Sequence, residues 1–211
     1  MTTNSKASLA LIIGTLAGLV TMSVHPTSRE LAADLAGGGH GVLNIFAHSV
    51  ALLAQPLILM GMLVLTMRLT AQRDTAIAAY ILFAWASVAI MLAATASGLI
   101  ATSVLAADVN RQDATPGGAI SAIQYTGLLN RAFAKVYVAF GSLAIVLWSV
   151  AMLRTGHVWR GLGIYGVVSG LAMLAGIVSG HLGVGIHGFG AVVLSQGIWF
   201  VWTAVVLRRL Q

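Results

Sequence analysis

The chain has 211 residues, of which 59% are hydrophobic and 8% charged, and its formal net charge is +6. Soluble domains carry about 25% charged residues, so this composition excludes a water-soluble globular fold and indicates a chain embedded in lipid. The absence of cysteine excludes disulfides, iron–sulfur clusters, thiolate metal sites and cysteine nucleophiles.

Long apolar runs follow one another along the chain, and only short polar breaks separate them. A membrane-spanning helix needs roughly 20 mostly apolar residues, whereas β-barrel strands show short alternating segments. The sequence therefore predicts an all-α, polytopic integral membrane protein that forms a single domain over residues 1–211. We interpret the first run as a retained helix, because no signal-peptide cleavage site clearly follows it. The six predicted transmembrane helices cover residues 8–24, 41–67, 75–105, 130–153, 159–179 and 187–207.

Lysine and arginine are divided unequally between the two sides of this bundle. The side that holds both termini carries the whole net charge, whereas basic and acidic residues cancel on the other side. By the positive-inside rule, we predict a multi-pass protein of the inner (plasma) membrane with both termini in the cytoplasm. The basic residues would contact anionic lipid headgroups, and we expect no nucleic-acid partner. The residues on the basic side are Lys6, Arg68, Arg73, Asp74, Arg154, Arg160, Arg208 and Arg209.

The first two outer loops are each predicted to contain a short surface helix. In the first loop, Thr27 and Glu30 have the spacing of a capping box, which predicts a helix over 28–36. In the second loop, a helix over 119–129 follows Pro116 and two glycines, and we expect it to lie on the membrane surface.

The histidines carry the main functional signal in the sequence. Among six histidines, only His157 falls on the inner side. The outer ones come from four different helices at similar depth, and neutral imidazole is the commonest protein ligand for metals. We therefore predict a metal centre in the outer half of the bundle. Its expected ligands are His48 and His181, then His25 and His187, and last His40.

A polar seam runs along the second predicted helix. His40, Asn44 and His48 are four residues apart in turn, and Gln55 continues the stripe. Ionisable residues at membrane depth face the bundle interior, and Asn44 could orient a ligand ring. Hydrogen bonding between helices is the alternative interpretation of this seam.

Haem b or a transition-metal ion (Zn, Cu or Fe) fits these ligands. Small residues would admit a flat macrocycle between helices, and Arg29, Arg131 and Lys135 lie at the level where haem propionates would need cations. Arg131 and Lys135 have an alternative role, in which their long side chains extend towards the lipid headgroups. Met22, three residues before His25, would suit copper if it faced the same site, although apolar filling is its alternative role.

Electron transfer, as in a membrane-bound oxidoreductase, is the function that this pattern favours, with a redox partner or an apolar substrate. One alternative is a membrane-embedded zinc hydrolase for lipid-like substrates. Another is a small-molecule or metal-ion transporter, although no acidic residue lies mid-membrane. Small-residue faces would allow oligomers. A shift of 141 positions places His40 on His181, Gln55 on Gln196 and Arg68 on Arg209, a faint internal repeat.

Overall fold

The computed structural model describes residues 2–25, 40–104, 117–156 and 159–210, and regular structure within these ranges is helical throughout. Six of the helices are long and apolar enough to cross a membrane, which confirms the six-helix, all-α prediction. The short η2 (Thr70–Gln72) leads into α4. The other elements are α1 (Thr3–Val24), α3 (His40–Arg68), α4 (Arg73–Ala94) with its continuation η3 (Thr95–Ile100), α6 (Gly117–Thr155), α7 (Arg160–Val178) and α8 (Ile186–Arg209).

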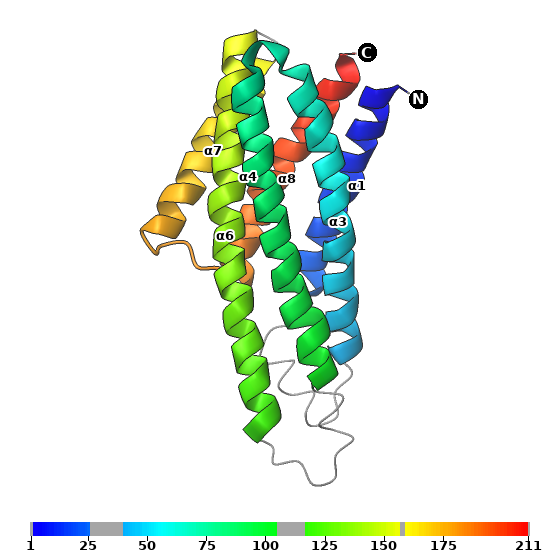
Figure 1. Ribbon diagram of the computed structural model, residues 1–211, viewed down its shortest axis with the longest axis vertical. Helices are drawn as coiled ribbons and strands as arrows, with labels where there is room; N and C mark the ends of the chain where they lie inside the picture. The colour runs from blue at the N-terminus through cyan, green and yellow to red at the C-terminus, as the bar shows by residue number, and fades with distance from the viewer. Residues whose placement is uncertain (1, 26–39, 105–116, 157–158, 211) are drawn as a thin grey trace.

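The helices form one elongated bundle, in which both chain termini lie at the same end (Figure 1). We call this the termini end, and we call the opposite end, where α1 finishes and α3 begins, the histidine end. α1 packs between α3 and α8, α4 packs between α3 and α6, and α7 packs mainly on α6. Since α3 and α8 both run towards the termini end, they lie parallel on either side of α1.

The bundle is closed by an aromatic cluster in its termini half. We call the four rings of Phe83, Trp148, Trp199 and Phe200 the aromatic plug. Trp148 stacks on Trp199 with ring centroids 6.0 Å apart, and Phe83 lies 5.6 Å from Phe200. Trp148 Nε1 donates a hydrogen bond of 3.0 Å to Thr66 Oγ1. All four side chains are buried and pack against one another across the bundle.

A polar clasp holds the helix ends together at the termini end. Arg68 donates to Asn4 Oδ1 from Nε at 3.0 Å and from Nη2 at 2.8 Å. Asn4 Nδ2 in turn donates to the Leu210 carbonyl at 3.3 Å. One side chain of α1 therefore joins the ends of α3 and α8.

One prediction about the loops is wrong. Residues 119–129 do not form a separate surface helix, because α6 runs without interruption from Gly117 to Thr155. The single Gly127 inside this stretch is tolerated in a helix. With 39 residues, α6 is about 58 Å long, so it extends beyond a hydrocarbon core of about 30 Å. The predicted helix over 28–36 lies outside the described residues.

Candidate functional site

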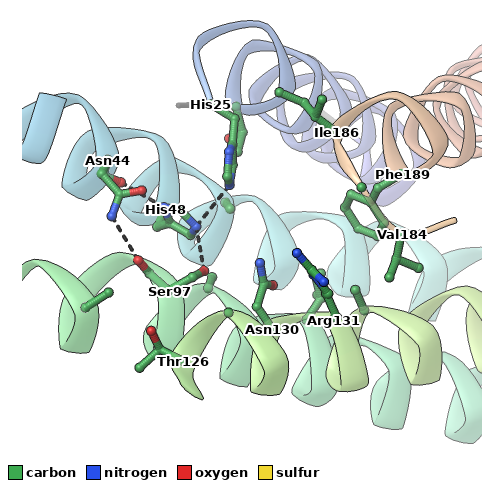
Figure 2. Close-up of a pocket in the computed structure, with 18 of the residues that line it drawn as sticks. His25, Asn44, His48, Ser97, Thr126, Asn130, Arg131, Val184, Ile186 and Phe189 are labelled. Carbon is green, nitrogen blue, oxygen red and sulfur yellow. Dashed lines mark hydrogen bonds between the residues drawn. The ribbon is translucent and has the colours of Figure 1, made fainter. Parts of the chain in front are cut away.

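A cavity of about 310 Å³ opens between the helices at the histidine end, and we call it the histidine pocket. Figure 2 shows His25 and His48 turned towards each other on one side, and Asn130 and Arg131 of α6 on the other. Its wall is mainly apolar, with Ile90, Ala134 and Phe189 among its residues. This size lies at the lower end of small-molecule sites, which are typically about 300–1,000 Å³.

His25 reaches the pocket because α1 ends there. It is the C-cap of α1 and has an extended backbone, with φ −68° and ψ 117°. The residue before a proline is disfavoured in the helical conformation, and Pro26 follows in the sequence. His25 Nε2 lies 3.2 Å from His48 Nε2, and the two rings meet edge to face with centroids 4.7 Å apart.

The ring of His48 is fixed by its own helix. His48 is only 4% exposed, and its Nδ1 lies 2.8 Å from the Asn44 carbonyl oxygen. Because a carbonyl only accepts, Nδ1 carries the hydrogen, and Nε2 of the neutral ring presents a lone pair. Ser97 Oγ lies 2.8 Å from this Nε2. The lone pair of a buried imidazole therefore points into the pocket.

The Asn44 side chain ties α3 to η3. Its Nδ2 donates to the Ser97 carbonyl at 2.9 Å and to Thr102 Oγ1 at 3.0 Å. The Asn44 amide and the His48 imidazole thus come from adjacent turns of α3, and both contact the same segment of the neighbouring helix. This cross-linking sets the distance between His48 and Ser97.

The helix that faces His48 widens into a π-turn over Thr95–Ile100. Such turns are rare and are frequent at functional sites. Gly98 lies in this turn, and a Cβ atom there would overlap the Cβ of His48. The close approach of α3 to η3 therefore depends on glycine at this position.

We expect Gly98→Ala to displace His48 and to destabilise the protein by about 1–3 kcal/mol, the usual cost of overpacking a close contact. The measurement is thermal unfolding in detergent. Gly127→Ala is the matched control, because a Cβ there meets nothing within 4 Å. Equal melting temperatures for the two variants would contradict the close contact.

The two Nε2 atoms of the histidine pair lie at a hydrogen-bonding distance, and the same distance is compatible with two ligands on one metal ion. Metal–imidazole bonds are about 2.0–2.1 Å long, so two nitrogens bound to a tetrahedral ion lie roughly 3.3 Å apart. The observed separation of 3.2 Å agrees with this value. Axial ligands on opposite faces of a haem would lie roughly 4 Å apart, which does not match the pair.

Two of the other predicted metal ligands, His181 and His187, do not join this pair. His181 and His187 are exposed and do not line the pocket. His181 follows Gly180, whose positive φ of 76° ends α7 as a left-handed cap. His187 lies beside the pocket-lining face of α8, which contains Ile186 and Phe189. His40 is the first residue of α3, and its side chain lies outside the described part of the structure.

The predicted cationic residues are also separated. Arg131 lines the pocket, whereas Lys135 is exposed and does not. A step of four residues advances about 40° around a helix, which carries Lys135 past the pocket-lining face of α6. Arg29 lies outside the described residues. Within the described part of the chain, no group of three or more His, Cys, Asp or Glu side chains could hold a metal ion.

Sequence reasoning missed the contribution of the third spanning segment. Ser97 and Thr102 of this segment meet Asn44 and His48. Ser97 stands beside Gly98 in a run of small residues, and this pairing of a hydroxyl with a glycine in an apolar span was the available signal. Serine in such helices commonly bonds its own backbone, as Ser97 also does with the Ala93 carbonyl, so the sequence pattern alone is ambiguous.

Comparison with protein-family models, with curated proteins and with solved structures gave no match. The function therefore has to be argued from the geometry and chemistry of the histidine pocket.

Proposed function

We propose that this protein is an integral membrane metalloprotein, in which His25 and His48 bind a single transition-metal ion beside an apolar pocket. The observation that supports this proposal most is the convergence of two imidazole nitrogens at 3.2 Å, together with the bond from His48 Nδ1 to a backbone carbonyl. Metal-ligating histidines almost always donate their second ring N–H to such an acceptor, which fixes the ring for coordination.

Copper is the ion that we favour. Divalent copper has the highest affinity for imidazole sites among first-row metals, and thioether ligands suit its reduced state. Met22 lines the same pocket as the two histidines, so a thioether is available on the same face of α1. Copper cycles between two oxidation states that differ by one electron, so the site would act in electron transfer or oxidoreduction with an apolar substrate or a redox partner.

Iron held as haem b is the less favoured form of this proposal. The histidine pair is too close for opposite axial ligation. Of the two described cations that were predicted for propionates, Arg131 lines the pocket and Lys135 does not. An individual ion needs neither a planar space nor these cations. Iron as a single ion remains compatible with the same two imidazoles.

The distribution of charge supports a definite orientation. Basic residues at six helix termini gather at the termini end, which would face the cytoplasm of a plasma membrane by the positive-inside rule. The histidine pocket would then open towards the opposite compartment. A partner that delivers electrons or substrate would approach from that compartment or from the lipid.

The test is the metal content and the visible spectrum of the protein purified in detergent. We expect stoichiometric copper after reconstitution and no Soret band. A Soret band would establish haem and overturn the single-ion form. Protein that retains no metal ion after gel filtration would overturn the metalloprotein proposal as a whole.

Hydrolysis is a second candidate, and one contact favours it. Ser97 Oγ lies 2.8 Å from His48 Nε2, and His48 is oriented from behind by a carbonyl, as in a nucleophile–base pair. Against a zinc hydrolase, no carboxylate stands among the described residues that line the pocket, and zinc hydrolases usually use one as the base.

Ser97→Ala separates these two functions. If the metal centre is correct, copper binding is expected to change by less than about 10-fold, because the variant retains both imidazoles. Metal analysis and electron paramagnetic resonance measure this. Hydrolytic activity towards ester substrates in the wild type, abolished in Ser97→Ala, would support the hydrolase instead.

A further inference from the structure

A second, smaller cavity adjoins the histidine pocket in the middle of the bundle. This deeper cavity has a volume of about 60 Å³, and we call it the glutamine cavity. The two cavities are neighbours, because five residues line both of them. The shared residues are Thr21, Met22, Ala51, Ile90 and Phe189.

Three polar atoms of the glutamine cavity have no hydrogen-bond partner among the described residues: Thr15 Oγ1, Gln55 Oε1 and Gln196 Nε2. Their side chains are 3%, 8% and 3% exposed. An unpaired polar group in an apolar medium costs several kcal/mol, so a hydrogen-bonding molecule in the cavity would relieve a large penalty.

Another polar group of the cavity, the Tyr137 hydroxyl, orients Gln196. The Tyr137 hydroxyl donates to Gln196 Oε1 at 2.8 Å, which leaves the Nε2 donor directed away from this bond. Gln55 supplies an acceptor, and Thr15 can donate or accept. No charged side chain lies among the described lining residues, so the cavity matches a neutral molecule that both donates and accepts.

We propose that the glutamine cavity is a second binding site, which holds water as a hydrated extension of the histidine pocket. A volume of 60 Å³ accommodates about two water molecules at their share of liquid volume. Thr15 lies ten residues before His25 on α1, which corresponds to about 15 Å along the helix. The hydrated path therefore reaches a depth close to half of a hydrocarbon core of about 30 Å.

The path ends at the aromatic plug. Phe200 and Ile58 line the floor of the cavity, and both belong to the buried apolar cluster that contains Trp148 and Trp199. Phe200 is one turn nearer the termini end than Gln196. Water therefore enters from the histidine end only, and the path does not cross the membrane.

The natural absence of cysteine allows a direct test by single-cysteine accessibility in proteoliposomes. The probes are Thr15→Cys and Gly18→Cys, since Gly18 lines the cavity and has only one atom, at 4.0 Å, near a Cβ. The control is Ala144→Cys, because Ala144 is 0% exposed, belongs to the buried apolar cluster and lines neither cavity. The reagent is a small, charged methanethiosulfonate that is applied to one side at a time.

We expect both probes to react at least roughly tenfold faster than Ala144→Cys, because the reactive thiolate forms only where water reaches the thiol. Reaction should occur only from the side opposite the termini. Rates equal to that of Ala144→Cys would overturn the hydrated site. Equal reaction from both sides would overturn the closed end and indicate a transport path. The measurement needs no bound metal ion, so its failure and that of the metal centre are distinguishable.

Discussion

His48→Ala is expected to lower the affinity of the protein for Cu²⁺ by more than about 100-fold, since even the loss of a group that only orients a ligand costs 10–100-fold. The variant removes one of the two imidazoles that converge at 3.2 Å. Copper titration in detergent, followed by electron paramagnetic resonance, measures the effect. His25→Ala should weaken binding to a similar degree.

The chain offers a matched control for this experiment. His187→Ala removes an imidazole of the same kind from α8, but that side chain is exposed and does not line the pocket. We expect its copper affinity to equal that of the wild type. If His187→Ala lost copper and His48→Ala retained it, the metal centre would be wrongly placed.

Trp148→Ala is expected to have the largest effect on stability, about 3–5 kcal/mol, the usual cost of truncating a fully buried tryptophan. The indole is 0% exposed, stacks on Trp199 and donates to Thr66. Its removal leaves a large void and takes away the donor to Thr66 Oγ1, whose own hydrogen bond to the Met62 carbonyl remains. Unfolding in mixed detergent micelles measures the loss.

Trp85→Ala is the control for the tryptophan experiment. Trp85 is 61% exposed on the outside of α4, where lipid replaces its contacts, so truncation should change stability by less than about 0.5 kcal/mol. Equal losses in the two variants would contradict the position of the aromatic plug. Trp148→Phe should fall between the two, because it retains a ring but loses the bond to Thr66.

The spans were predictable because hydrocarbon sets both the length and the composition of a crossing helix. The start of α6 was not, since residues 119–129 are compatible with a separate helix or with the extension of a spanning one. Only the packing of the whole helix decides between these, and Gly127 does not interrupt α6. A hydropathy pattern carries no information about such continuity.

The site was predictable in part. The similar depth of the outer histidines in the membrane placed His25 and His48 in one group of predicted ligands, and the structure brings these two side chains together. The same depth argument included His181 and His187, which rotation about the helix axis and the cap at Gly180 keep away from the pocket. The positions of Gln55 and Gln196 in the faint repeat meet in one cavity, although neither pattern nor spacing indicates which helix faces which.

X-ray absorption at the copper edge, on protein reconstituted with stoichiometric copper, tests the metal centre most directly. The account predicts imidazole nitrogens at about 2.0–2.1 Å, with the outer scattering of two rings in the wild type and of one ring in His48→Ala. Copper that shows only oxygen neighbours, or the same two rings in wild type and His48→Ala, would contradict a metal ion shared by His25 and His48.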